Sequence, residues 1–224
     1  MSWSDLFFPG NPARREQIIR KTQELRDLMQ NNFRATNQLI EVLKEHLGLS
    51  FSPITLNKQA SIKENCDVMI QCMHEIQAEV EKINKKLKEK LEPTLYEKLR
   101  TLSPTVHDLK HISKAVSGTL SVTGFTSCIV LSWLIKNGMI LKNITSTFVK
   151  VGSGCIGCVV LGVLFLGIDM ITQAILGSIE RDELEKALKE YEEALNEFRP
   201  ASEQFQDNIT YVRIKIEMIE EEKN

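Results

Sequence analysis

Two sets of side chains in this sequence have the types and spacing that metal or redox chemistry would use. His107 and His111 are four residues apart with Asp108 beside the first, which places two imidazoles on one face of a helix. Cys155 and Cys158 have the C-x-x-C spacing of redox and metal motifs. Neither set has a further ligand motif nearby, and the cysteines lie in an uncharged apolar stretch that disfavours the thiolate. We therefore expect surface histidines and small packing cysteines.

The rest of the chain contains no motif that indicates catalysis. The sequence has no phosphate-binding loop, dinucleotide-binding glycine pattern or nucleophile elbow. A formal net charge of -2 argues against a nucleic-acid partner, and five cysteines, an odd number, argue against a disulfide scaffold. The sequence predicts a protein that is not an enzyme, with no cofactor and no metal site.

The most apolar stretch predicts a transmembrane helix. Residues 151–168 carry no charge, and the apolar character resumes after Asp169. Eighteen helical residues rise about 27 Å, close to the roughly 30 Å hydrocarbon core of a bilayer. Asp169 would cost about 2.5 to 3.5 kcal/mol at the bilayer centre, so we place it at the interface. We expect an integral membrane protein, with the organelle left open, whose membrane segment over residues 151–171 includes Val151, Gly157, Val160, Leu164, Leu166, Ile168, Asp169 and Ile171.

A second uncharged stretch, residues 115–135, lies between Lys114 and Lys136. Seven of its residues are Ser or Thr and two are Gly, so that only the part from Cys128 onward is strongly apolar. Two interpretations stay open. The stretch either crosses the bilayer and forms a helical hairpin with residues 151–171, or it stays outside.

Amphipathic helices are predicted on both sides of these stretches. Asn11 followed by Pro12 indicates a helix start, and Gly48 indicates its end, with a loop over residues 48–60. The pattern Ser61-x-x-Glu64 predicts a capping box at the start of a second helix. Pro93 is expected to end or kink this helix, and one or two further turns follow before Pro104.

Two of the helices carry apolar residues at alternating steps of four and three, the spacing of a coiled-coil seam. The seam of the second helix consists of Ile62, Cys66, Met69, Met73, Ile76, Val80, Ile83 and Leu87. The seam of the C-terminal helix consists of Leu184, Leu188, Tyr191, Leu195, Phe198, Phe205, Ile209, Val212, Ile216 and Ile219, with Ser202 as its one polar member. Pro200 falls outside this seam, on the outer face of the helix.

These elements predict an all-α chain of long amphipathic coiled-coil helices flanking a hydrophobic membrane segment. We expect an N-terminal helical region over residues 1–111, a marginally hydrophobic segment and connection over 112–150, the transmembrane helix over 151–171 and a C-terminal helix over 172–224. Residues 180–224 have a net charge of -7 from fourteen acids and seven bases, whereas residues 1–111 have +2 from seventeen bases and fifteen acids. The two regions are expected to attract each other weakly.

The sequence resembles the family called single-pass membrane and coiled-coil domain-containing protein 3. The likeness lies in Asn11-Pro12 with Arg14-Arg15-Glu16, in residues 62–67 and 91–96, and in residues 166–171 running into 174–177. The resemblance implies a membrane-associated helical protein with a single membrane pass centred on residues 151–171. It implies no active site.

Two functions follow from these expectations. The leading hypothesis is an integral membrane protein without catalytic activity, whose coiled-coil helices bind a second copy or a helical protein partner at the membrane. The competing hypothesis is a conditional membrane-inserting or pore-forming-like bundle, in which long helices cover a hydrophobic hairpin until a trigger releases it. The marginal polarity of residues 115–127 favours the second hypothesis more than a permanent span would.

Overall fold

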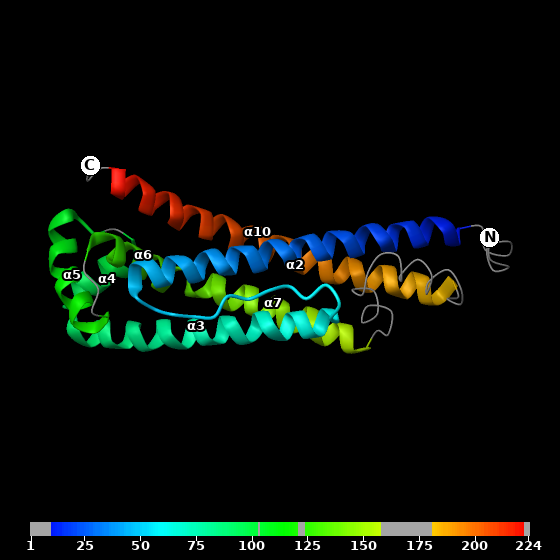
Figure 1. The fold of residues 1–224 in the computed structure, drawn as a ribbon, viewed down its shortest axis with the longest axis horizontal. Helices are drawn as coiled ribbons and strands as arrows, with labels where there is room; N and C mark the ends of the chain where they lie inside the picture. Colours follow the sequence, from blue (N-terminus) through cyan, green and yellow to red (C-terminus); the bar gives the residue numbers. More distant parts are fainter. Residues whose placement is uncertain (1–9, 103, 121–123, 158–180, 222–224) are drawn as a thin grey trace. The chain divides into compact units, whose positions relative to one another are not determined.

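A computed structural model of the 224-residue chain describes residues 10–102, 104–120, 124–157 and 181–221. All of the regular structure in these ranges is helical, as the sequence predicts (Figure 1). The helices are α2 (Asn11–Leu47), α3 (Ile62–Lys90), α4 (Pro93–Arg100), α5 (Val106–Leu120), α6 (Phe125–Lys136), α7 (Gly138–Gly157) and α10 (Arg181–Glu221).

The helix ends follow the residues that predict them. α2 begins at Asn11 and ends before Gly48, which has a φ of 66° that favours glycine. The backbone N–H of Ser61 donates to the Glu64 carboxylate at 2.7 Å, and the N–H of Glu64 donates to Ser61 Oγ at 3.2 Å, so the capping box is confirmed. α3 ends at Lys90, and α4 starts at Pro93 because proline fits the first turn of a helix but not its interior.

The helices divide between two compact units. The first consists of Met1–Phe33, Thr55–Ile70 and Ile144–Glu203, and therefore contains parts of α2, α3, α7 and α10. Its core includes Phe148 and Phe198, whose rings meet edge to face with centroids 4.9 Å apart. At its surface, the acidic N-terminal half of α10 pairs with bases of α2, in Arg14–Glu185 at 2.7 Å and Lys21–Glu192 at 3.2 Å. These two contacts have the polarity that the charge distribution predicts, whereas the Arg199–Glu24 pair of the same helices has the opposite polarity.

The second unit consists of Arg34–Ile54, Gln71–Asn143 and Gln204–Asn224. It contains all of α4, α5 and α6, which contact one another and lie together in Figure 1. Its buried apolar residues come from α6 and from the helices around it, for example Leu43, Met73, Leu99, Ile112 and Phe205.

Both predicted seams lie on buried faces of single helices. The described seam positions of α3 are all buried: Ile62, Cys66, Met69, Met73, Ile76, Val80, Ile83 and Leu87. In α10 the buried seam positions are Tyr191, Leu195, Phe198, Ser202, Phe205, Ile209, Val212 and Ile216, while Leu188 is half-buried. The side chains of Leu184 and Ile219 lie outside the described part. Pro200 is exposed within α10, on the outer face as predicted.

The region predicted as a marginal segment and connection contains three helices. Residues 115–135 do not form one straight helix, because α5 ends at Leu120 and α6 begins at Phe125 after a bend of 81°. The predicted boundary between residues 150 and 151 falls inside α7, which continues to Gly157. Beyond α7, the predicted membrane residues Val160, Leu164, Leu166, Ile168, Asp169 and Ile171 lie outside the described residues.

Candidate functional site

The most apolar of the described helices, α6, is largely buried within the second unit. Its buried residues run almost without a break from Ser127 through Cys128 and then from Val130 to Leu134. These seven positions cover well over half of the helix circumference, while Ile129 is half-buried and Lys136 is exposed, so α6 is broadly buried and does not have a single narrow buried stripe. A helix that is apolar all around must be covered by protein or by lipid.

The polar residues of α6 are accommodated by hydrogen bonds to neighbouring backbone. Ser127 Oγ donates to the carbonyl of His46 at the end of α2, at 2.6 Å, and Ser132 Oγ donates to the carbonyl of Leu99 in α4. These carbonyls belong to the last turns of their helices, where no intrahelical donor is available. The two serines therefore join α6 to the ends of α2 and α4 without leaving a buried hydroxyl unpaired.

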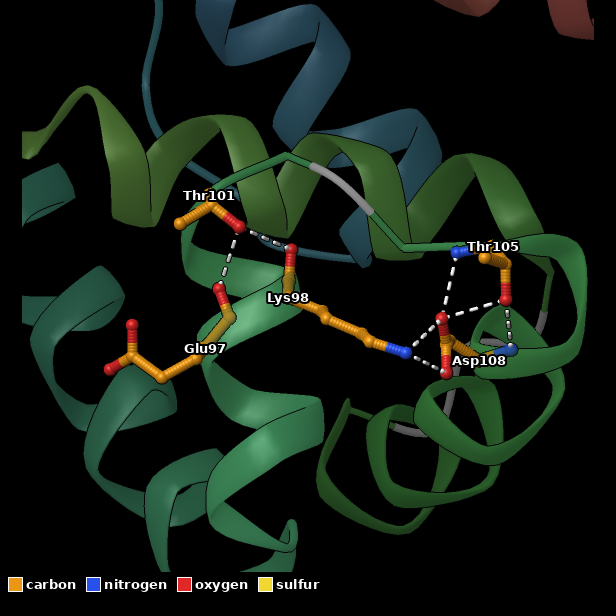
Figure 2. Close-up of polar contacts among 5 residues, drawn as sticks. All are labelled: Glu97, Lys98, Thr101, Thr105 and Asp108. Carbon is orange, nitrogen blue, oxygen red and sulfur yellow. Dashed lines mark hydrogen bonds and ion pairs between the residues drawn. The ribbon is translucent and has the colours of Figure 1, made fainter.

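One ion pair joins the two short helices beside α6. Figure 2 shows the Lys98 side chain reaching from α4 to the Asp108 carboxylate in the first turn of α5, where Nζ lies 3.0 and 2.9 Å from the two oxygens. The Thr105 backbone N–H and hydroxyl both donate to Asp108 Oδ2, at 2.9 and 2.7 Å. Asp108 thus caps α5 and holds α4 at the same time, and we call Lys98, Thr105 and Asp108 the α4–α5 bridge.

The hydrogen bonds of the α4–α5 bridge favour the charged form of its carboxylate. The two donors of Thr105, followed by the Lys98 ammonium, hold the pKa of Asp108 well below its usual range. The Asp108 side chain is only 8% exposed, so little water competes with these partners. The bridge is consequently intact at neutral and mildly acidic pH, and it does not act as a proton donor or acceptor there.

The described start of the predicted membrane helix also packs against protein. Val151 is buried, and a Cβ added at Gly152 would lie 3.1 Å from Cys66 Cβ in α3. The glycine therefore permits a close approach of α7 and α3 within the first unit. Gly157 is the last residue of α7, and nothing beyond its backbone is described.

His107 and His111 are not joined by Asp108 in a metal site. The His107 and His111 rings are 4.9 Å apart and both residues are exposed, but the Asp108 carboxylate is engaged by Lys98 and Thr105. In the described ranges, no group of three or more His, Cys, Asp or Glu side chains is arranged to hold a metal ion.

Among the helices that the structure describes, none is by itself long and apolar enough to cross a bilayer. Residues His107–Leu120 and Phe125–Lys136 satisfy that measure of length and composition only as a pair, across their 81° bend.

The α4–α5 bridge was not predicted from the sequence. Thr105-x-x-Asp108 has the same form as the recognised Ser61-x-x-Glu64 pattern and precedes an apolar run, so this half of the bridge was detectable. Lys98 carries no comparable indication, because it contacts Asp108 only after the turn between α4 and α5 brings the two helices together.

Comparison with known proteins gives a family without an assigned activity. The family model described as protein of unknown function (DUF4533) matches residues 14–174, which is most of the chain. No solved structure matches the chain.

Proposed function

We propose that this chain, which belongs to the DUF4533 family of proteins of unknown function, is a conditional membrane-inserting helical bundle without catalytic activity. In this proposal the bundle covers a hydrophobic hairpin made of residues 115–135 and 151–171, and a trigger releases the hairpin into a bilayer. The resemblance of the sequence to the single-pass membrane and coiled-coil domain-containing protein 3 family supports a membrane role for the chain. The proposed hairpin differs from the single membrane pass that this resemblance implies.

The observation that carries the proposal is the burial of most of α6, seven of its twelve residues, by other helices of its own unit. An apolar helix that is permanently in lipid needs no such cover. The described start of the second apolar segment, residues 151–171, is also covered by protein, because Val151 is buried and Gly152 packs on Cys66. Protein thus surrounds most of α6 and the described start of the second segment, where lipid would take its place after release.

The free energy gained when residues 115–135 enter a bilayer is small. Their Leu, Ile, Phe and Val residues are Val116, Leu120, Val122, Phe125, Ile129, Val130, Leu131, Leu134 and Ile135. At about -0.3 to -0.6 kcal/mol each, these nine residues contribute only about -3 to -5 kcal/mol to membrane insertion. The Ser, Thr and Gly residues reduce this gain further. A gain of this size does not pull the segment out of an intact bundle, so the segment enters lipid only when its unit is destabilised.

Alkaline carbonate extraction of cells that express the full chain tests this proposal. We expect the wild-type protein to divide between the soluble fraction and the membrane pellet, and the variant Asp108→Asn to shift toward the pellet because the α4–α5 bridge is lost. Glu97→Gln is the matched control, since it removes a carboxylate from the exposed face of α4. Wild-type protein found entirely in the carbonate-resistant pellet would contradict the proposal and indicate a permanent span.

A second function, binding of a partner at the membrane, is favoured by one exposed stripe. Tyr211, Ile214 and Met218 follow each other at steps of three and four on α10, and each is about half exposed. The seams do not offer a comparable surface, because their described positions in α3 are already buried within one chain. Loss of self-association in Ile214→Glu, measured by sedimentation, would support this function, and an unchanged mass for wild type and variant at the monomer value would exclude self-association.

A further inference from the structure

A cavity of about 240 Å³ opens in the second unit between α5, α6 and the C-terminal part of α10. Its inner wall is formed by Leu109, Trp133 and Val212, of which Trp133 and Val212 are almost completely buried. Its rim is formed by Tyr211, Lys215 and Met218, and Tyr211 and Met218 are 47% and 48% exposed. The cavity therefore leads from a solvent-exposed rim into an apolar core.

The rim carries a positive charge. Lys215 Nζ lies 5.7 Å from the centroid of the Tyr211 ring, within cation–π distance, and both residues line the cavity. In the described part of the chain, Lys215 has no carboxylate partner within ion-pairing distance. A negatively charged group at the rim would thus meet a cation that is already in place.

The inner wall is apolar. Trp133 lines the cavity, but its Nε1 atom is buried and is not offered to a ligand. Together with Leu109 and Val212, the indole ring favours a hydrocarbon chain over a polar group at this wall.

The size of the cavity restricts the ligand further. Pockets for drug-sized molecules usually have about 300 to 1,000 Å³, and this cavity is smaller. A narrow chain fits such a volume better than a fused ring system or two acyl chains side by side.

From these features we infer that the cavity binds an anionic single-chain amphiphile, such as a fatty acid, with its chain against Trp133 and its carboxylate at Lys215. The inference goes beyond the proposed membrane function and does not depend on it, because the cavity is present while α6 is covered by protein.

Quenching of Trp133 fluorescence by bromine-labelled dodecanoate tests the inference. The experiment uses the full chain with the substitution Trp3→Phe, which leaves Trp133 as the single tryptophan. We expect saturable quenching, an apparent affinity at least fivefold weaker in Lys215→Met, and an unchanged affinity in Arg213→Met, which removes an exposed charge from the same helix. Bromine-labelled dodecanol is expected to bind wild type and Lys215→Met equally, and more weakly than dodecanoate binds wild type.

Several results would overturn the inference. Quenching that rises linearly without saturation and is equal in all variants would mean partitioning into the protein surface only. Equal affinity for dodecanol and dodecanoate in the wild type would remove the role of Lys215. Ile129→Phe adds volume at the cavity wall and must weaken dodecanoate binding as well. This second variant tests the cavity independently of any folding defect in Lys215→Met.

A second arm distinguishes the source of the amphiphile. Vesicles of an anionic phospholipid that carries the same bromine label present the chain from a bilayer instead of from solution. Quenching in the vesicles that depends on Lys215, without quenching by free dodecanoate, would contradict a single-chain ligand.

Discussion

The one polar position in the C-terminal seam has a specific partner. Ser202 is completely buried, and Asn32 Nδ2 of α2 donates to its Oγ at 2.7 Å within the first unit. Ser202→Ala should lower the free energy of unfolding by about 0.5 to 1.5 kcal/mol because the hydrogen bond is lost. Unfolding in urea measures the change. Glu203→Ala, at the exposed neighbouring position, is expected to stay within about 0.5 kcal/mol, and an equal loss in both variants would contradict the role of the pair.

The α4–α5 bridge predicts a pH dependence of stability. The pKa of Asp108 is lower in the folded protein than in the unfolded chain, so the bridge adds stability above the unfolded pKa of about 3.9, and this contribution is lost as the pH falls toward the folded pKa. The stability difference between wild type and Asp108→Asn should therefore be constant from about pH 8 to 5 and shrink below about pH 4. Urea unfolding of both proteins across this range measures it, and a difference that disappears between pH 7 and 5 would contradict the assigned carboxylate.

At the scale of single residues, contacts between neighbours in the chain are predictable from the sequence, and contacts between distant residues are not. Ser61 and Glu64 are near each other in the chain, so their hydrogen bonds were predictable. Asn32 and Ser202 are 170 residues apart, and only the packing of α2 against α10 brings them together. Lys98 was not predictable either, because the turn between α4 and α5 brings it to Asp108 and no periodic pattern in the sequence indicates that contact.

At the scale of the helices, a side chain added at Gly152 should lower the stability of the protein. Gly152→Leu should destabilise the protein by about 1 to 3 kcal/mol, because its Cβ would already lie 3.1 Å from Cys66 Cβ. Thermal unfolding measures the effect. Gly138→Ala is the matched control in the same helix, since a Cβ there meets nothing within 4 Å and alanine is the better helix former. Gly152→Leu with the stability of wild type would contradict the close approach of α7 and α3.

The periodicity of apolar residues predicted the amphipathic helices well and the central helix poorly. A stripe at steps of four and three identifies which face of α3 is buried, whatever buries it. α6 has no stripe, because it is apolar all around, and such a sequence is equally suited to a protein core and to lipid. The break between α5 and α6 coincides with the Ser, Thr and Gly residues that dilute residues 115–127.

At the scale of the whole molecule, each unit has a core of its own built from segments that are distant in sequence. Burial of the α6 residues alone, at about 1.5 to 3 kcal/mol for a full Val, Leu or Ile side chain, is comparable with the 5 to 15 kcal/mol by which domains are usually stable. Release of α6 from its unit is therefore a change of the whole unit, and it requires a compensating environment such as lipid.

The most direct test of this account is the position of Trp133 in the presence of vesicles. The full chain with Trp3→Phe, alone and with Asp108→Asn added, is mixed with vesicles of neutral phosphatidylcholine brominated on its acyl chains. We expect Trp133 of the first protein to remain largely unquenched and Trp133 of the second to be quenched strongly, because loss of the α4–α5 bridge releases α6 into the bilayer. Equal quenching in both proteins, whether absent or complete, would contradict a covered helix that enters lipid when released.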